Sequence, residues 1–287
     1  MVTTRFAPSP TGRLHLGHAW SAILAHDYAR EHRGRFLLRV EDIDGTRSRP
    51  EHVAAILADL EWLGLAWDGE VVFQSQRLAS YEAALDRLKG TGLLYPCFCT
   101  RSDIAASTTA PHGPEGAVYP GTCRGLKAPD LSRPHCWRLD METALSQVRR
   151  LGESRDEGEL LFTDHNIPIL ANPSAQGDVV LARKDAPASY HLAVTIDDAA
   201  QHITHIIRGT DLFHATHIHR LLQALLNLPT PQYRHHALLT GPEGQRLAKR
   251  HNAPTLEAMR LSGTDGRALA NQLRAGALPV GIAAAKA

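Results

Sequence analysis

Two histidines three residues apart, His15 and His18, could act together on a phosphate. They lie in the stretch RFAPSPTGRLHLGHAW, residues 5–20. Residues at this spacing share one face of a helix. The helix breakers Pro8 and Pro10 predict a loop that is followed by a helix. Two imidazoles and the backbone N–H groups of a helix N-terminus would then form a site suited to an anion.

A basic cluster far downstream could meet the same phosphate groups. It reads QRLAKRH, residues 245–251, and contains Arg246, Lys249 and Arg250. Neither GxGxxG nor GxxxxGK[ST] occurs in the chain. Taken singly, the cluster reads as a solvated turn, and the histidine pair as structural or as half of a metal site. Together they favour chemistry at phosphorus, in which positioned donors stabilise charge on the phosphate oxygens.

All four cysteines lie between Cys97 and Cys136, a clustering that favours a metal over disulfides in a reducing compartment. Thiolates prefer zinc in a closed tetrahedral site, which would hold together a segment rich in proline and glycine. A tetrahedral site needs four ligands, and the preference of zinc for thiolates alone would make Cys136 the fourth, after Cys97, Cys99 and Cys123. However, CWRLD at 136–140 is predicted to be a strand, where a buried free cysteine is common.

The acidic stretch VEDIDGTR, residues 40–47, follows an apolar run typical of a buried parallel strand. Its D-x-D-G pattern resembles part of an EF-hand loop. Gly45 comes too soon after Asp42 for that loop, and no glutamate closes it at the required position. The register therefore excludes an EF-hand.

Composition and patterning indicate an α/β protein. Strand-like and helical patterns alternate near the N-terminus and resume after a loop-rich segment, which predicts a doubly wound parallel sheet. The chain has 287 residues, 43% of them hydrophobic, and a net charge of +1 that gives no argument for nucleic acid. No apolar run could span a bilayer and no secretory leader precedes Arg5, so the cytoplasm is expected.

Two separate motifs carry a family resemblance. PSPTGRLHLGH resembles the ATP-binding signature of class I aminoacyl-tRNA synthetases in its glutamate-specific form, and RLAKR is similar to that class's second, mobile-loop signature. Ala248 stands where the family usually has serine, so one hydroxyl contact is missing. The resemblance covers most of the chain and implies a Rossmann-like catalytic domain that forms glutamyl-adenylate from L-glutamate and ATP with Mg²⁺.

The resemblance implies roles for individual residues. His15, His18 and Lys249 would be catalytic. The implied ATP-binding residues are Pro8, His15, Gly17, His18, Arg246, Leu247, Ala248, Lys249 and Arg250. The implied glutamate-binding residues are Arg5, Phe6, Ala7, Pro8, Ser9, Glu41, Tyr190 and Arg208. Arg5 and Arg208 suit a dicarboxylic substrate because guanidinium groups bind carboxylates bidentately. The sequence leaves open which of the two binds the side-chain carboxylate.

The cysteine pattern resembles the glutamyl-queuosine branch of this family, in which tyrosine completes a zinc site. Cys97, Cys99, Tyr119 and Cys123 match that pattern and imply one structural Zn²⁺ per chain. This branch transfers glutamate to the queuosine base in the anticodon of tRNA(Asp), so the anticodon loop of that tRNA is the expected partner.

The expected organisation has four parts and lacks an anticodon-binding domain. They are 1–95, the first half of the catalytic domain; 96–186, an inserted acceptor and zinc module; 187–235, the second half; and 236–287, the signature loop with a short helical region. A monomer with no membrane association is expected.

Three other functions remain open at this point. The first is a minimal synthetase that charges the 3′ end of tRNA(Glu). The second is a small-molecule adenylyltransferase or ligase with HxGH chemistry and no RNA partner. The third is a catalytically dead, zinc-stapled binding protein.

Overall fold

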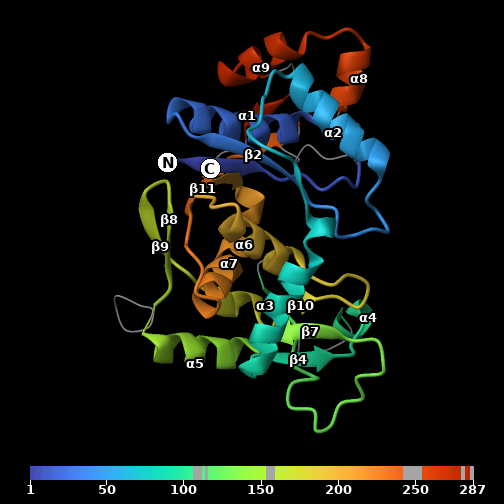
Figure 1. Ribbon diagram of the computed structural model, residues 1–287, viewed down its shortest axis with the longest axis vertical. Coiled ribbons are helices and arrows are strands. Elements are labelled where there is room, and N and C mark those ends of the chain that lie inside the picture. The colour runs from blue at the N-terminus through green and yellow to red at the C-terminus, as the bar shows by residue number, and fades with distance from the viewer. Residues whose placement is uncertain (106–111, 114–115, 153–158, 242–253, 279–281, 285–287) are drawn as a thin grey trace. The chain divides into compact units, whose positions relative to one another are not determined.

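The computed structural model describes residues 1–105, 112–113, 116–152, 159–241, 254–278 and 282–284. Within it the chain divides into two units (Figure 1). Unit 1 comprises residues 1–76, 202–213 and 231–287, and unit 2 comprises residues 77–201 and 214–230.

Unit 1 contains the parallel strands that the N-terminal pattern predicts. They are β1 (Thr3–Phe6), β2 (Arg35–Val40), β3 (Val72–Phe73), β11 (His205–Gly209) and β12 (Gln232–His236). β2 pairs in parallel with β1 and with β3, and β11 pairs in parallel with β12. The backbone N–H of Thr204 donates to the carbonyl oxygen of Thr3 at 3.0 Å, which places the start of β11 beside β1. The carboxyl ends of β1 and β2 therefore meet at one edge, where α/β proteins bind ligands.

Helix α1 (Leu16–Glu31) begins where the proline-rich loop ends. Its N-cap is His15 in an extended conformation, so an imidazole replaces the serine, threonine or aspartate that usually occupies this position. α1 lies across β1 and β2 in Figure 1, and it packs on both strands. Its buried residues are Leu16, Ala19, Ala22, Ile23, Ala25 and Ala29. The helix predicted after the loop is thereby confirmed, with His18 in its first turn.

The apolar core of unit 1 forms between α1, the strands and three further helices. These are α2 (Pro50–Trp62), α8 (Leu256–Leu261) and α9 (Gly266–Arg274). α2 starts with proline at its first position, where the missing N–H costs no hydrogen bond. The largest fully buried apolar side chains of this core are Phe36, Ile23, Leu38, Ile56, Leu60, Leu63 and Leu65.

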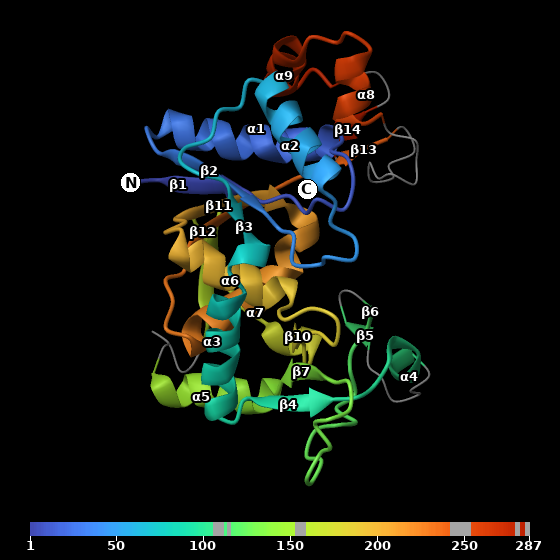
Figure 2. The same cartoon turned by 45° about the vertical axis from the view of Figure 1, so that its right-hand side comes forward.

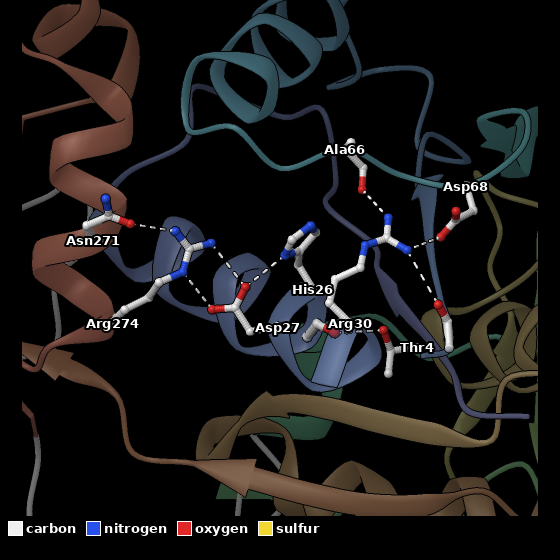
Figure 3. Close-up of polar contacts among 10 residues, drawn as sticks. Thr4, His26, Asp27, Arg30, Ala66, Asp68, Asn271 and Arg274 are labelled. Carbon is white, nitrogen blue, oxygen red and sulfur yellow. Dashed lines mark hydrogen bonds and ion pairs between the residues drawn. The ribbon is translucent and has the colours of Figure 1, made fainter. Parts of the chain in front are cut away.

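An ion pair on the outer face of α1 joins this helix to α9 (Figure 3). The Nε and Nη2 atoms of Arg274 donate to Asp27 at 2.7 and 3.0 Å, and His26 Nδ1 lies 2.8 Å from the same carboxylate. A second arginine, Arg30 of α1, contacts Asp68 at 2.8 Å. Partial burial would raise the pKa of Asp27, but the hydrogen bonds from His26 and Arg274 outweigh it and lower the pKa from 3.8 to about 2.

Replacing Asp27 with asparagine is expected to lower the free energy of unfolding by about 1 kcal/mol at pH 7. The pKa shift corresponds to about 2 kcal/mol, which the partial exposure of the pair reduces. Because the folded-state pKa is the lower one, this stability is present above pH 4 and is lost as the pH falls from there toward 2. Urea unfolding of both proteins between pH 7 and pH 3 measures the difference. Asp86→Asn, at an exposed pair with Lys89, is the control and should change little. A difference between Asp27→Asn and wild type that did not depend on pH would contradict this account.

Unit 2 carries the loop-rich segment and the helices that flank it. Its helices are α3 (Leu78–Gly90), α4 (Arg101–Ala105), α5 (Met141–Leu151), α6 (Tyr190–Ala200) and all but the first residue of α7 (Phe213–Leu225). Its strands are β4 (Leu94–Cys97), β5 (His112–Gly113), β6 (Gly116–Ala117), β7 (Cys136–Leu139), β8 (Leu161–Asp164), β9 (Ile167–Leu170) and β10 (Val180–Ala182). β7 lies between β4 and β10 and pairs with both in antiparallel orientation (Figure 2). The strand predicted at CWRLD is confirmed.

The described strands form mixed sheets instead of the single parallel sheet that the sequence predicts. Antiparallel pairs come from the inserted segment and from β13 (Leu239–Thr240) with β14 (Ala283–Ala284) in unit 1. The β8–β9 hairpin, for example, turns at His165 and Asn166, both with positive φ, as a tight two-residue turn requires. The compact units divide the chain at residue 76, whereas the sequence predicts a boundary after residue 95. The predicted domain boundaries stay a prediction, because a compact unit need not coincide with an inserted module.

None of the helices in the described parts of the chain combines the length and the apolar character needed to cross a bilayer.

Candidate active site and metal cluster

The two imidazoles of the HLGH motif lie together at the N-terminus of α1. Their ring centroids are 3.9 Å apart. The backbone N–H of Gly17 donates to His15 Nδ1, and that of His15 donates to His18 Nδ1, both at 3.1 Å. A ring nitrogen that accepts a hydrogen bond carries no proton, so in each neutral ring the proton is on Nε2. Both side chains therefore present an N–H donor beside the helix N-terminus.

Gly17 lies against the ring of His15, so its lack of a side chain matters for the position of that imidazole as well as for access to the site. A Cβ built on Gly17 would lie 3.0 Å from Cε1 of His15 and 3.2 Å from its Nδ1. Both distances are shorter than an ordinary van der Waals contact, so the imidazole would have to shift by a few tenths of an ångström to admit a side chain. The sequence prediction included this glycine only as one of the ATP-binding residues that the family resemblance implies.

The first loop and the end of β2 come together as the predicted glutamate site requires. The backbone N–H of Glu41 donates to the carbonyl oxygen of Pro8 at 3.0 Å. The carboxylate of Glu41 lies 3.5 Å from Nη2 of Arg39, a fully buried guanidinium. A carboxylate therefore lies at the carboxyl end of β2, next to the loop that contains Ser9.

Arg5 and Arg208 occupy equivalent places in neighbouring strands of unit 1. Each is the penultimate residue of its strand, Arg5 in β1 and Arg208 in β11. Their exposed fractions are 5% and 4%, so both guanidinium groups are largely removed from water. A guanidinium group at a strand end can bind a carboxylate bidentately, which suits both positions to an acidic ligand.

The chain returns to the HLGH motif after the second signature. Thr255 forms an isolated β-bridge with His15, and the backbone N–H of Leu256 donates to the carbonyl oxygen of Leu14 at 2.9 Å. The signature residues themselves, Arg246, Leu247, Ala248, Lys249 and Arg250, lie outside the described residues.

A cluster of cysteines in unit 2 could hold a metal ion. The sulfur atoms of Cys97, Cys99 and Cys123 all lie within 4.8 Å of one another. The Tyr119 hydroxyl lies 3.7 Å from the sulfur of Cys99 and accepts a hydrogen bond from the backbone N–H of Cys123 at 2.7 Å. Three thiols and a phenol thus surround one point, and this set fits a tetrahedral thiophilic metal.

Cys136 is buried in β7 beside this cluster, but its thiol has another partner. It donates to the carbonyl oxygen of Cys97 at 3.4 Å. A hydrogen bond from the same thiol, with further ones from Tyr119 and Arg138, outweighs burial, which would raise the pKa of the Cys97 thiol, and lowers that pKa to about 4. Among the described residues, the cysteines placed to bind a metal ion together are therefore Cys97, Cys99 and Cys123, and Cys136 is not one of them.

A polar network on the neighbouring strands stabilises Tyr119 and the cysteine cluster. The guanidinium of Arg138 lies 3.9 Å above the ring of Tyr119 and donates to the carbonyl oxygen of Asp178 at 2.6 Å. The carboxylate of Asp178, 1% exposed, accepts hydrogen bonds from Tyr95 and, at 2.6 Å, from Arg124. These contacts join β4, β7 and the segment before β10 around the tyrosine.

Residues 1–282 match the family model of the class I tRNA synthetase catalytic domain for E and Q. The chain belongs to this family. It is 51% identical to the Glutamyl-Q tRNA(Asp) synthetase of Rhodobacter capsulatus over 271 aligned residues. The alignment covers 91% of this chain and 96% of the relative. The protein of the same name from Symbiobacterium thermophilum is 44% identical over 284 residues, or 95% of this chain and 85% of the relative.

Solved synthetase structures have the same fold. A glutamate-tRNA synthetase from Elizabethkingia anophelis superposes with a TM-score of 0.73 at 26% identity and covers 95% of this chain. A glutamate tRNA ligase from Elizabethkingia meningosepticum, solved with its amino acid, has the same TM-score and identity. This synthetase chain spans 61% of the first of these chains and 60% of the second.

Unit 1 contains the predicted residues of the first loop and of the strand ends. The residues concerned are Arg5, Phe6, Ala7, Pro8, Ser9, His15, Gly17, His18, Glu41 and Arg208. Tyr190 belongs to unit 2, where it is the first residue of α6, and its exposed fraction is 36%. The assignment of ATP-binding and glutamate-binding residues in this synthetase stays a prediction.

Sequence reasoning overlooked the residues that hold these groups in place. His235 accepts a hydrogen bond from Arg208 Nε, and Arg138 and Asp178 brace the metal cluster. The alternation in QYRHH at 232–236 puts Tyr233 and His235 on one face of a strand. That pattern could have indicated that the side chain of His235 points into the fold. Nothing in the sequence pattern points to Asp178, because its partners are 37 to 83 residues away.

Proposed function

We propose that this chain activates L-glutamate with ATP and transfers the glutamyl group to the queuosine base in the anticodon of tRNA(Asp). The observation that carries the proposal is its 51% identity to a Glutamyl-Q tRNA(Asp) synthetase, over nearly the full length of that relative. The geometry at the N-terminus of α1 supports the first half-reaction. The Cys97, Cys99 and Cys123 cluster supports membership of the queuosine branch, since the sequence pattern of that branch includes it.

In the first half-reaction, a glutamate carboxylate oxygen attacks the α-phosphate of ATP and pyrophosphate leaves. Negative charge spreads over the phosphate oxygens as the bond forms. In our proposal His15 and His18 donate from Nε2 to these oxygens, Lys249 adds a positive charge, and Mg²⁺ accompanies ATP. Catalysis is then mainly positioning and electrostatic stabilisation.

In the second half-reaction, a nucleophile of the queuosine base attacks the carbonyl carbon of glutamyl-adenylate, and AMP leaves. A single-stranded loop with its target base splayed out is the usual form in which RNA is read specifically. Binding should weaken steeply with salt, because phosphate contacts dominate RNA affinity even when the protein's net charge is only +1. With tRNA as partner, the cytoplasm is the proposed compartment.

The test is the site of glutamate attachment. Labelled glutamate should attach to tRNA(Asp) that carries queuosine and to its isolated anticodon stem-loop. Attachment should persist on tRNA(Asp) from which the 3′-terminal adenosine has been removed, because the acceptor diol of the 3′ end is then absent. It should not occur on tRNA(Asp) without queuosine. Charging of tRNA(Glu) at an intact 3′ end would instead identify a minimal conventional synthetase. Glutamate activation with no RNA acceptor at all would indicate a small-molecule ligase.

We also propose that Cys97, Cys99, Tyr119 and Cys123 hold one structural Zn²⁺. The thiol spacing and the nearby phenol support this set, and the hydrogen bond from Cys136 to the Cys97 carbonyl argues against Cys136 as the fourth ligand. A metal there would hold together a segment that builds little core of its own.

Metal analysis of the purified protein should give about one zinc per chain. Cys99→Ser should release the metal because it removes one thiolate from a closed site, whereas Cys136→Ser should retain it. The two cysteines form a matched pair, since both are part of the same apolar cluster. Loss of zinc in Cys136→Ser, together with retention in Tyr119→Phe, would show that Cys136 is the fourth ligand.

A further inference from the structure

The guanidinium of Arg208 is held by two acceptors from its own unit. Its Nε donates to Nε2 of His235 at 3.2 Å, and its Nη2 donates to the carbonyl oxygen of Leu212 at 3.1 Å. Neither acceptor carries a charge. These two bonds restrict the plane in which the guanidinium lies.

The imidazole of His235 is itself held in one orientation. Parallel pairing of β11 with β12 sets His235 directly opposite Arg208. The ring of Tyr233 is parallel to it within 1°, with centroids 5.8 Å apart, and the ring of Phe213 meets it edge-on at 5.1 Å. His235 is 6% exposed, so its ring packs inside unit 1 and cannot rotate without disturbing these neighbours.

The hydrogen bond also sets the charge that His235 can carry. An imidazole nitrogen that accepts from Nε–H has to be unprotonated. Protonation of His235 at Nε2 would set its N–H against the Nε–H of Arg208, so that two donors face each other, and would place a second cation beside Arg208. The other titratable groups around the ring are Tyr233 on the same strand, Asp211 in the 3₁₀ turn that packs on β12, and His236 at the next position.

We propose that His235 is a positioning residue, whose neutral imidazole holds the guanidinium of Arg208 in the orientation that receives a carboxylate of glutamate. This inference rests on the proposed function, because it takes glutamate as the ligand of Arg208. A bidentate guanidinium contact depends on orientation as much as on charge, so an arginine that can rotate binds a carboxylate less well. His235 acts through Arg208, and its Nε2 serves as a hydrogen-bond acceptor instead of transferring a proton.

Glutamate-dependent pyrophosphate exchange with three variants tests the proposal. His235→Leu removes the acceptor at similar volume and should raise the KM for glutamate roughly 10- to 100-fold, the usual weight of a hydrogen bond to a charged group. The kcat and the KM for ATP should stay within about threefold, because the acceptor does not touch the reacting phosphate. His235→Gln offers an uncharged amide oxygen and should restore most of the glutamate affinity. His205→Gln, at the far end of β11, is the matched control and should resemble wild type. Thermal unfolding of each variant establishes that it is folded.

The pH profile separates positioning from a merely structural role. In wild type the KM for glutamate should rise as the pH falls through the range in which histidines titrate, and His235→Gln should lack that part of the rise. A folded His235→Leu variant with unchanged KM, or a His235→Gln variant with the wild-type pH profile, would overturn the inference alone. Absence of glutamate-dependent exchange in wild type would overturn the proposed function, and this inference with it.

Discussion

Replacing Arg208 with alanine should lower kcat/KM for glutamate in pyrophosphate exchange by about 30- to 5,000-fold. The guanidinium is 4% exposed, and removal of one partner from a buried charged pair costs about 2–5 kcal/mol. The same loss is expected for Arg5→Ala, at the equivalent place in β1. Lysine at either position should recover only part of the activity, because it keeps the charge but lacks the planar fork.

A partly buried arginine of the same unit, away from the predicted glutamate-binding residues, is the control for both variants. Arg234 in β12 lies over the ring of Tyr28, with 5.0 Å from its Cζ to the ring centroid, and Arg234→Ala should keep near-wild-type exchange. Glutamine and aspartate should be poor substrates for wild type, since each leaves part of the arginine pair without its carboxylate. Near-normal exchange by both Arg5→Ala and Arg208→Ala would reject these residues as the glutamate clamps.

The second large effect is expected at the HLGH motif. His18→Ala should lower the kcat of pyrophosphate exchange by about 100- to 1,000-fold, the usual cost of removing one pre-positioned donor from a transition state. The backbone bond to His18 Nδ1 leaves its proton on Nε2, so the wild-type ring is already prepared to donate. Single-turnover formation of glutamyl-adenylate measures the chemical step directly.

Two further variants show whether the effect belongs to the imidazole pair. His26→Ala, in the same helix but bonded to Asp27, should leave the rate of adenylate formation nearly unchanged. Gly17→Ala should slow it although no donor is lost, because the new Cβ would lie 3.0 Å from the ring of His15. Equal rates in wild type and a folded His18→Ala variant would show that the step does not use this histidine.

Those parts of this protein that depend on local pattern could be predicted from its residues alone. Proline and glycine before HLGH stop regular structure, so the position of α1 and the closeness of His15 and His18 at its N-terminus were predictable. The apolar run before Glu41 and the alternation at CWRLD likewise predicted β2 and β7. The two signatures were enough for the family, because their residue types and order are seldom combined by chance.

Tertiary structure decided which groups meet and in what state. The bond from Glu41 to Pro8 and the bond from Arg208 to His235 join segments that no local pattern connects. The Nε2 protons of His15 and His18 follow from backbone hydrogen bonds, which residue types do not reveal. Likewise, only the register of β4 against β7 gives the thiol of Cys136 a carbonyl partner and separates it from the other three cysteines. Local propensities act over a few residues, whereas these contacts depend on how distant strands align, and that alignment is a property of the packed fold.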